Sequence, residues 1–124
     1  LNEILDTAIT AFEHGDIEQA KSVEPLEEVI DNLRTEIRNR HVKRLRKGKC
    51  TIEMGFVLTD LITNYERVAD HCSNIAVCMI QIHDNSFDTH SYISDLKATN
   101  NEEFRRKFTV FSEKYMLPDA KKTD

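Results

Sequence analysis

The sequence predicts an all-α fold: an antiparallel three-helix bundle with additional helices toward the C-terminus. Two observations support this. The 124 residues include only three glycines and two prolines, which favours long uninterrupted elements over hairpins and tight turns. Hydrophobic residues make up 40% of the chain and charged residues 31%, and the apolar ones recur at helical spacing over long segments. A chain of this length is expected to form one domain around one core.

The first helix is expected from Leu1 to Phe12, where the apolar residues share one helical face. Gly15 supplies a stop signal, and Asp16 supplies a cap for the next helix. Apolar residues then recur at helical spacing almost to Gly48, which predicts a long second helix. Pro25 lies inside this segment and predicts either a kink or a helix start just before it.

Thr51 is the expected cap of the third helix, whose broad apolar face continues to Met79 and implies a length of about 50 Å. Asn85 ends this pattern. A short helix is expected over 88–96, and a polar tail over 119–124. Between them lies an amphipathic segment with an aromatic stripe, which is more typical of a helix folded onto its own bundle than of a partner-binding helix; the stripe consists of Phe104, Phe108, Phe111 and Tyr115.

Charge and cysteine content narrow the function classes. The net charge of -5 gives no general electrostatic reason to bind nucleic acid. Cys50, Cys72 and Cys78 cannot all pair within the chain, and a reducing, cytoplasmic compartment fits them best. No apolar run approaches the roughly 20 residues that a membrane-spanning helix needs.

The candidate metal site consists of two acidic couples, Glu27 with Asp31 and Glu66 with Asp70. Each couple has four-residue spacing, so its carboxylates lie on one helix face and repel each other. Antiparallel packing of the two helices would bring the couples together. Hard oxygen ligands of this kind suit magnesium, calcium, manganese or iron ions. The alternative is an ordinary acidic surface, with Arg34 as the ionic partner of Asp31.

The histidines do not strengthen the metal interpretation. None follows a glutamate at the Glu-x-x-His spacing of di-iron helical bundles. Each is therefore expected to be a surface or packing residue; the five are His14, His41, His71, His83 and His90. The sequence also contains no Gly-x-Ser-x-Gly, no Cys-x-x-Cys and no glycine-rich phosphate loop. We therefore expect a protein that is not an enzyme. An enzyme with a carboxylate-bridged metal site is the weaker alternative, because the Glu-x-x-His pattern is absent.

A dense basic block closes the second helix. Cations are favoured at a helix C-terminus, which is a sufficient structural explanation. The functional alternative is contact with anionic lipid headgroups or with an acidic partner surface; the residues expected to make it are Arg40, Lys43, Arg44, Arg46 and Lys47.

The third helix resembles the signature helix of the PhoU family. The similarity lies in DLITNYERVADHCSNIA (residues 60–76), and EEVIDNL (residues 27–33) is similar to the acidic motif on that family's preceding helix. Four further segments resemble the PhoU-type C-terminal domain of bacterial sodium-dependent phosphate cotransporters; they are RNRHVKRLRKGKC, DHCSNIA, FDTH and KYMLP. The chain thus resembles one PhoU-like three-helix repeat over 1–84, followed by a helical extension over 85–124.

This resemblance implies a cytoplasmic regulatory or interaction domain of a sodium/phosphate cotransporter, with a role in phosphate uptake and homeostasis. Its partner would be the membrane portion of the same polypeptide, at the cytoplasmic side of the cell membrane. The alternative is a stand-alone PhoU-like regulator that binds a transporter or a sensor kinase. The family implies metal binding at Glu27, Asp31, Glu66 and Asp70. PhoU proteins usually contain two such repeats, so the face that a second repeat would cover implies a homodimer.

Overall fold

A computed structural model of the chain describes residues 1–84 and 102–119. All regular elements in these ranges are helices, which confirms the all-α prediction; they are α1 (Asn2–His14), α2 (Ile17–Ala20), α3 (Val23–Arg46), α4 (Ile52–His83) and α6 (Glu102–Lys114). The short helix expected over 88–96 lies outside the described residues. The division of the chain at residue 84 stays a prediction.

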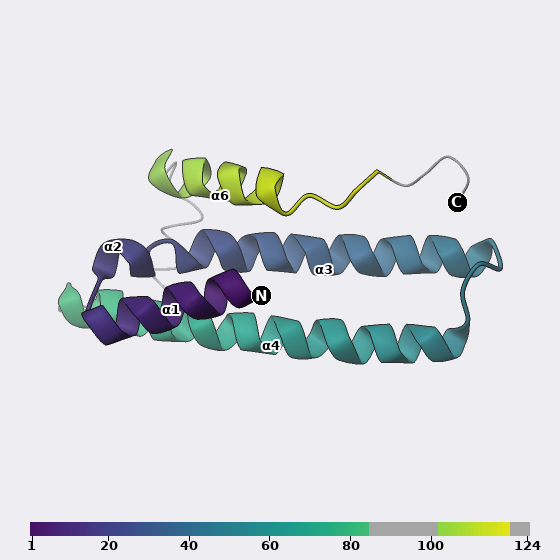
Figure 1. The fold of residues 1–124 in the computed structure, drawn as a ribbon, viewed down its shortest axis with the longest axis horizontal. Helices are drawn as coiled ribbons and strands as arrows, with labels where there is room; N and C mark the ends of the chain where they lie inside the picture. The colour runs from purple at the N-terminus through teal and green to yellow at the C-terminus, as the bar shows by residue number, and fades with distance from the viewer. Residues whose placement is uncertain (85–101, 120–124) are drawn as a thin grey trace.

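Two long antiparallel helices, α3 and α4, form the frame of the molecule (Figure 1). The shorter α1 lies beside the half of this pair that contains the end of α4, and α6 lies along the other side of α3 (Figure 1). The third bundle helix is therefore much shorter than the other two. As a result, one half of the α3–α4 pair lacks a third helix among the described residues.

The turn after α1 follows its sequence signals. Gly15 adopts a left-handed conformation, with φ of 62°, which a residue without a Cβ atom tolerates best. The backbone N–H groups of Gly15 and Asp16 donate to the carbonyl groups of Phe12 and Ala11. The Asp16 carboxylate then accepts a hydrogen bond from the backbone N–H of Gln19 at 3.0 Å. One glycine and one aspartate thus end α1 and start α2.

The long second helix predicted from Asp16 onward is interrupted. The chain turns at Lys21 and Ser22, and α3 begins at Val23. Pro25 is therefore the third residue of α3, in the first turn, where a backbone N–H has no partner within the helix. The expected helix start just before Pro25 is confirmed, whereas a single continuous helix is wrong. The break folds α2 back toward α1 and α4, which both contact it.

The turn between α3 and α4 was predicted correctly. Gly48 has φ of 66°, and the Thr51 hydroxyl accepts a hydrogen bond from the backbone N–H of Met54 at 3.2 Å. The 32 residues of α4 correspond to about 48 Å at the usual helical rise.

The core lies where α1, α2, α3 and the second half of α4 meet. Small side chains of α1 and α4 allow these helices to approach closely. Phe111 and Tyr115 of α6 pack against this cluster, so the aromatic stripe does fold onto its own bundle. The buried members are Ile4, Ala8, Ala11, Ala20, Val23, Leu26, Ala69, Cys72, Ala76 and Ile80.

Candidate functional site

The predicted acidic couples lie on the two long antiparallel helices, Glu27 and Asp31 on α3 and Glu66 and Asp70 on α4. Glu27, Asp31 and Glu66 are half-buried, whereas Asp70 is exposed. The fold brings Asp31 and Glu66 to the same neighbour, which is Arg34. In the ranges that the structure describes, no group of three or more His, Cys, Asp or Glu side chains is arranged to hold a metal ion.

Arg34 joins the two helices electrostatically. Its Nη2 atom lies 2.7 Å from Asp31 Oδ1, and its Nη1 atom forms an ion pair with Glu66 across the α3–α4 interface. Burial acts to lower the pKa of Arg34, but the hydrogen bond to Glu66 and the charges of Asp31 and Glu66 outweigh it and raise the pKa. The guanidinium therefore stays charged and pairs with two of the four candidate ligands, Asp31 and Glu66.

A metal ion at this site would have to displace the Arg34 side chain, because Asp31 and Glu66 are already paired. An arginine that neutralises carboxylates does the same electrostatic work that a bound cation would do. The partner of Asp31 that the sequence suggested is thus confirmed. The four-residue metal site stays a prediction, and Arg34 is the residue that any binding has to move.

A buried polar contact beside this site was not anticipated from the sequence. Glu24 is only 3% exposed and Ser73 only 8%, and the Ser73 hydroxyl donates a hydrogen bond to the Glu24 carboxylate. Glu24 lies in the first turn of α3, where the helix dipole favours an acidic side chain. The sequence indicated the position of Glu24 in a first helical turn, because Pro25 follows it. The burial of Glu24, however, depends on α4. The contact joins α3 to α4 on the core side.

The basic residues gather at the far end of α3. Arg40 is already engaged, since it pairs with Glu36 and donates to the backbone carbonyl of Pro118. Lys43, Arg46 and Lys47 are exposed, and Arg44 is half-buried. The end of the α3–α4 hairpin therefore presents several cations, while Arg40 holds the segment after α6 against α3.

His41 is a packing histidine, as expected. It is 8% exposed, and its Nδ1 atom lies 3.5 Å from the Cys50 sulfur. Gly55 of α4 faces its ring, because a Cβ atom at Gly55 would lie 2.6 Å from His41 Nε2. His14, His71 and His83 are exposed, whereas His90 lies outside the described residues.

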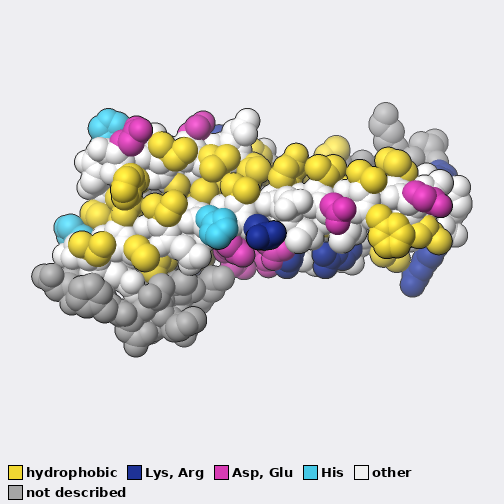
Figure 2. Space-filling view, turned by 90° about the horizontal axis from the view of Figure 1, so that it is seen from below, with side chains coloured by type: hydrophobic (Ala, Val, Ile, Leu, Met, Phe, Trp, Pro, Cys, Tyr) yellow, Lys and Arg dark blue, Asp and Glu magenta, His cyan; other side chains and the backbone are white. Residues whose placement is uncertain are grey.

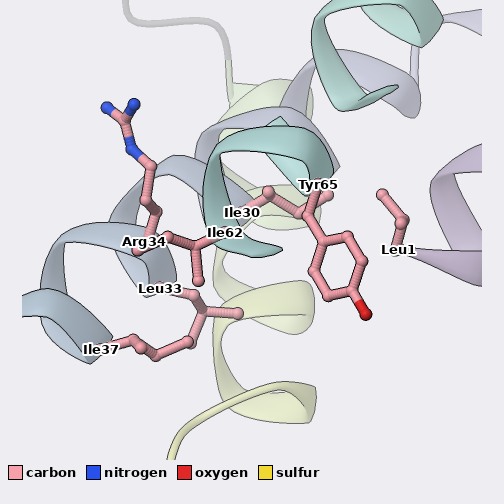
Figure 3. Close-up of a pocket in the computed structure, with 7 residues that line it drawn as sticks. All are labelled: Leu1, Ile30, Leu33, Arg34, Ile37, Ile62 and Tyr65. Carbon is pink, nitrogen blue, oxygen red and sulfur yellow. The ribbon is translucent and has the colours of Figure 1, made fainter. Parts of the chain in front are cut away.

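An apolar groove lies between α3 and α4 just beyond the first residue of the chain. Its lining comes from α3 and α4, with Leu1 at one end, as Figure 3 shows; the residues are Leu1, Ile30, Leu33, Arg34, Ile37, Ile62 and Tyr65. The guanidinium of Arg34 points away from the apolar side chains (Figure 3). The groove thus offers an apolar surface to a docking side chain and no cluster of catalytic groups.

No helix in the described ranges is both long enough and apolar enough to span a bilayer. The longest, α4, is interrupted by charged residues.

Comparison with known proteins shows a relative of part of this chain. A phosphate-specific transport system accessory protein, PhoU homolog 1 of Thermotoga maritima, is 30% identical over 80 residues. The aligned part covers 64% of this chain and 34% of that relative, so the chain spans about a third of the relative's length. No solved structure matches the chain.

A family model describes the same part of the chain. The model for the PhoU domain matches residues 1–79, which run from α1 to near the end of α4. The matched range includes both acidic couples, all of α3, and α4 up to residue 79. This chain therefore belongs to the PhoU domain family.

Proposed function

We propose that this chain is a non-enzymatic regulatory domain in phosphate transport, joined to a sodium-dependent phosphate cotransporter and acting on it from the cytoplasmic side of the membrane. The observation that carries the proposal is the PhoU-domain match over 1–79. The sequences of the basic turn and of the KYMLP segment resemble those of cotransporter C-terminal domains. This resemblance supports the assignment to a sodium-dependent phosphate cotransporter. The alternative is a stand-alone regulator that binds a transporter or a sensor kinase, and the same match supports it equally.

The test is sodium-dependent uptake of labelled phosphate by cells that carry the complete natural gene. One strain keeps the gene intact, and a second lacks the codons for these 124 residues. We expect uptake in the second strain to lose its response to the phosphate supply. If the gene encodes no membrane spans, and the deletion changes only the signalling response to phosphate, the stand-alone alternative is correct. Unchanged uptake and unchanged signalling would contradict both.

The basic end of the hairpin is the proposed contact with anionic headgroups. Cations near an anionic membrane surface gain roughly 1 kcal/mol each, and Lys43, Arg46 and Lys47 are exposed at one end of the molecule. In the strain that carries the intact gene, replacing these three residues with glutamate should weaken the regulation of phosphate uptake. Reversing Arg105 on α6, which is also exposed, is the control for a single cation elsewhere on the molecule and should leave regulation intact.

We also propose that Glu27, Asp31, Glu66 and Asp70 bind a divalent or iron ion once Arg34 is displaced. An ion that binds only the folded state raises the melting temperature. The Asp31→Ala, Asp70→Ala double variant should lose this rise with manganese, iron, magnesium or calcium. Arg34→Met removes the competing cation and should enlarge the rise. An equal metal response in the double variant would contradict the site.

A further inference from the structure

The first half of α4 carries an apolar stripe that faces solvent. Met54, Val57, Leu61 and Tyr65 have exposed fractions between 48% and 57%, and their spacing of three and four residues places them on one side of the helix. We call these four residues the α4 stripe. Figure 2 shows hydrophobic side chains following this side of the molecule. Contiguous exposed apolar surface of this kind marks an interaction site.

The α4 stripe belongs to a longer series of apolar positions along α4. In the second half of α4, the rest of the bundle covers these positions. The next positions at the same spacing are Val68, Cys72 and Met79; Cys72 is buried in the core, and the other two pack against it. The change from covered to exposed occurs near Leu1, which lines the groove together with Tyr65. A single amphipathic face of α4 is thus half covered by the bundle and half bare.

The apolar groove lies next to the stripe. Leu33 and Ile37 of α3 and Ile62 of α4 line it together with Tyr65 (Figure 3). A helix lying along the α4 stripe would therefore also bury side chains in this groove. Packing an apolar helix face into such a groove is a common mode of helix recognition.

We propose that the occupant is a second copy of this chain, whose α4 stripe packs antiparallel against the first around a two-fold axis near Asp60. The stripe is centred within about one residue of that point, because the midpoint of Met54 and Tyr65 lies between residues 59 and 60, and the midpoint of Val57 and Leu61 lies at residue 59. Each copy's stripe then covers the other copy's groove. The two α3–α4 hairpins form a four-helix bundle, which is a common solution for two helical pairs with apolar faces.

Charges beside the stripe favour a second copy over an unrelated helix. Glu53 lies seven residues before Asp60 and Arg67 seven residues after it, all three exposed on one flank of α4. An antiparallel pair centred on Asp60 therefore places Glu53 opposite the partner subunit's Arg67, twice by symmetry. Asp60 of one copy comes to lie opposite Asp60 of the other copy, and these like charges repel each other. Two attractive pairs and one repulsive contact thus define the register.

Sedimentation velocity of the 124-residue chain over a range of concentrations tests the dimer. We expect a monomer–dimer equilibrium that Leu61→Asp weakens by at least about tenfold, since a charge would be buried at the contact. The matched control is Ile82→Asp, which changes an apolar side chain of α4 that is 67% exposed and lies beyond the stripe. This control should dimerise normally. Circular dichroism of each variant confirms that the helices remain.

The register is tested by charge changes that leave the stripe intact. Asp60→Asn should tighten the dimer by about twofold to fivefold, because the repulsion at the axis disappears. Glu53→Arg should weaken it, and the added Arg67→Glu should restore it. A monomer at every concentration, or a dimer indifferent to Leu61→Asp, would overturn the proposal. A dimer that is altered by the charge changes at Asp60 and Glu53 but is not weakened by Leu61→Asp would also contradict the proposal. None of these outcomes depends on the role in phosphate transport.

Discussion

Cys72 and Cys78 lie on the same helix but in different surroundings. Cys72 is buried and Cys78 is exposed, and burial raises the pKa of the Cys72 thiol. Because the thiolate is the reactive form, brief treatment of the native protein with iodoacetamide should modify Cys78 and spare Cys72. Peptide mass spectrometry measures both. Cys72 should react only after the chain is unfolded in urea, and equal native rates at the two positions would show that Cys72 is not protected.

The raised pKa of Cys72 also predicts how stability depends on pH. The unfolded chain releases the thiol proton at a lower pH than the folded chain, so ionisation favours the unfolded state. The free energy of unfolding should therefore fall as the pH rises above the ordinary thiol pKa of 9.0. Urea unfolding at successive pH values measures this fall. Cys72→Ala should make the decline shallower, and an unchanged pH profile would assign it to other groups.

At the scale of elements, the α3–α4 contact depends on a residue without a side chain. Gly55 faces His41, which is buried. Replacing glycine by alanine inside an exposed helix usually stabilises it by roughly 0.5–1 kcal/mol. Here the added methyl group would overlap the imidazole, so Gly55→Ala should lower the free energy of unfolding by about 1–3 kcal/mol. Urea denaturation gives the value.

The control is the same substitution in a His41→Ala background. Without the ring, the methyl group has space, and the usual helix gain of roughly 0.5–1 kcal/mol should return. The difference between the two backgrounds measures the coupling between the helices. Gly55→Ala that stabilises the protein with His41 present would mean that α3 and α4 do not approach this closely in solution.

At the scale of the whole molecule, α6 connects the C-terminal part of the chain to the bundle. Glu3 of α1 pairs with Lys114 at 2.8 Å and accepts a hydrogen bond from the Tyr115 hydroxyl. Phe111 packs against the core cluster. Phe111→Ala should therefore lower the free energy of unfolding by about 1–3 kcal/mol. Thermal melting followed by circular dichroism provides the measurement.

The matched control is Val110→Ala, one residue earlier in α6. Val110 is 54% exposed, so its replacement should change stability by less than about 0.5 kcal/mol. If both variants melt like the wild type, α6 contributes little to the bundle, and the one-repeat unit over 1–84 carries the stability. If both are equally destabilised, the effect lies in the helix itself and not in its packing.

Much of the fold was predictable from local signals. Gly15, Gly48 and Thr51 mark helix ends because their effects on φ or on capping act within a few residues. The break at Lys21 and Ser22 was only partly predictable. The apolar period runs through it without a gap, so Pro25 alone signalled that a new helix begins there. Packing of α2 against both α1 and α4 outweighs the local tendency toward one continuous helix.

The candidate site was predictable as a set of residues, but not as an arrangement. The sequence places Glu27 and Asp31 on one face, and Glu66 and Asp70 on another, because helical spacing is fixed. It identified Arg34 as a neighbour of Asp31. It did not place Arg34 against Glu66, since that contact depends on the register of α3 against α4. The same register buries Glu24 beneath Ser73, 49 residues away in the chain.

The sequence by itself determined most of the helices, the caps Asp16 and Thr51, the apolar faces and the family. These depend on interactions between residues a few positions apart, and on motifs that are read directly from the chain. Tertiary structure decided which carboxylates Arg34 neutralises, which histidine contacts Gly55 and which half of α4 is covered by α1. Those features depend on how far each helix extends beside its neighbours. Contacts between distant residues form only when whole helices pack, so no local pattern contains them.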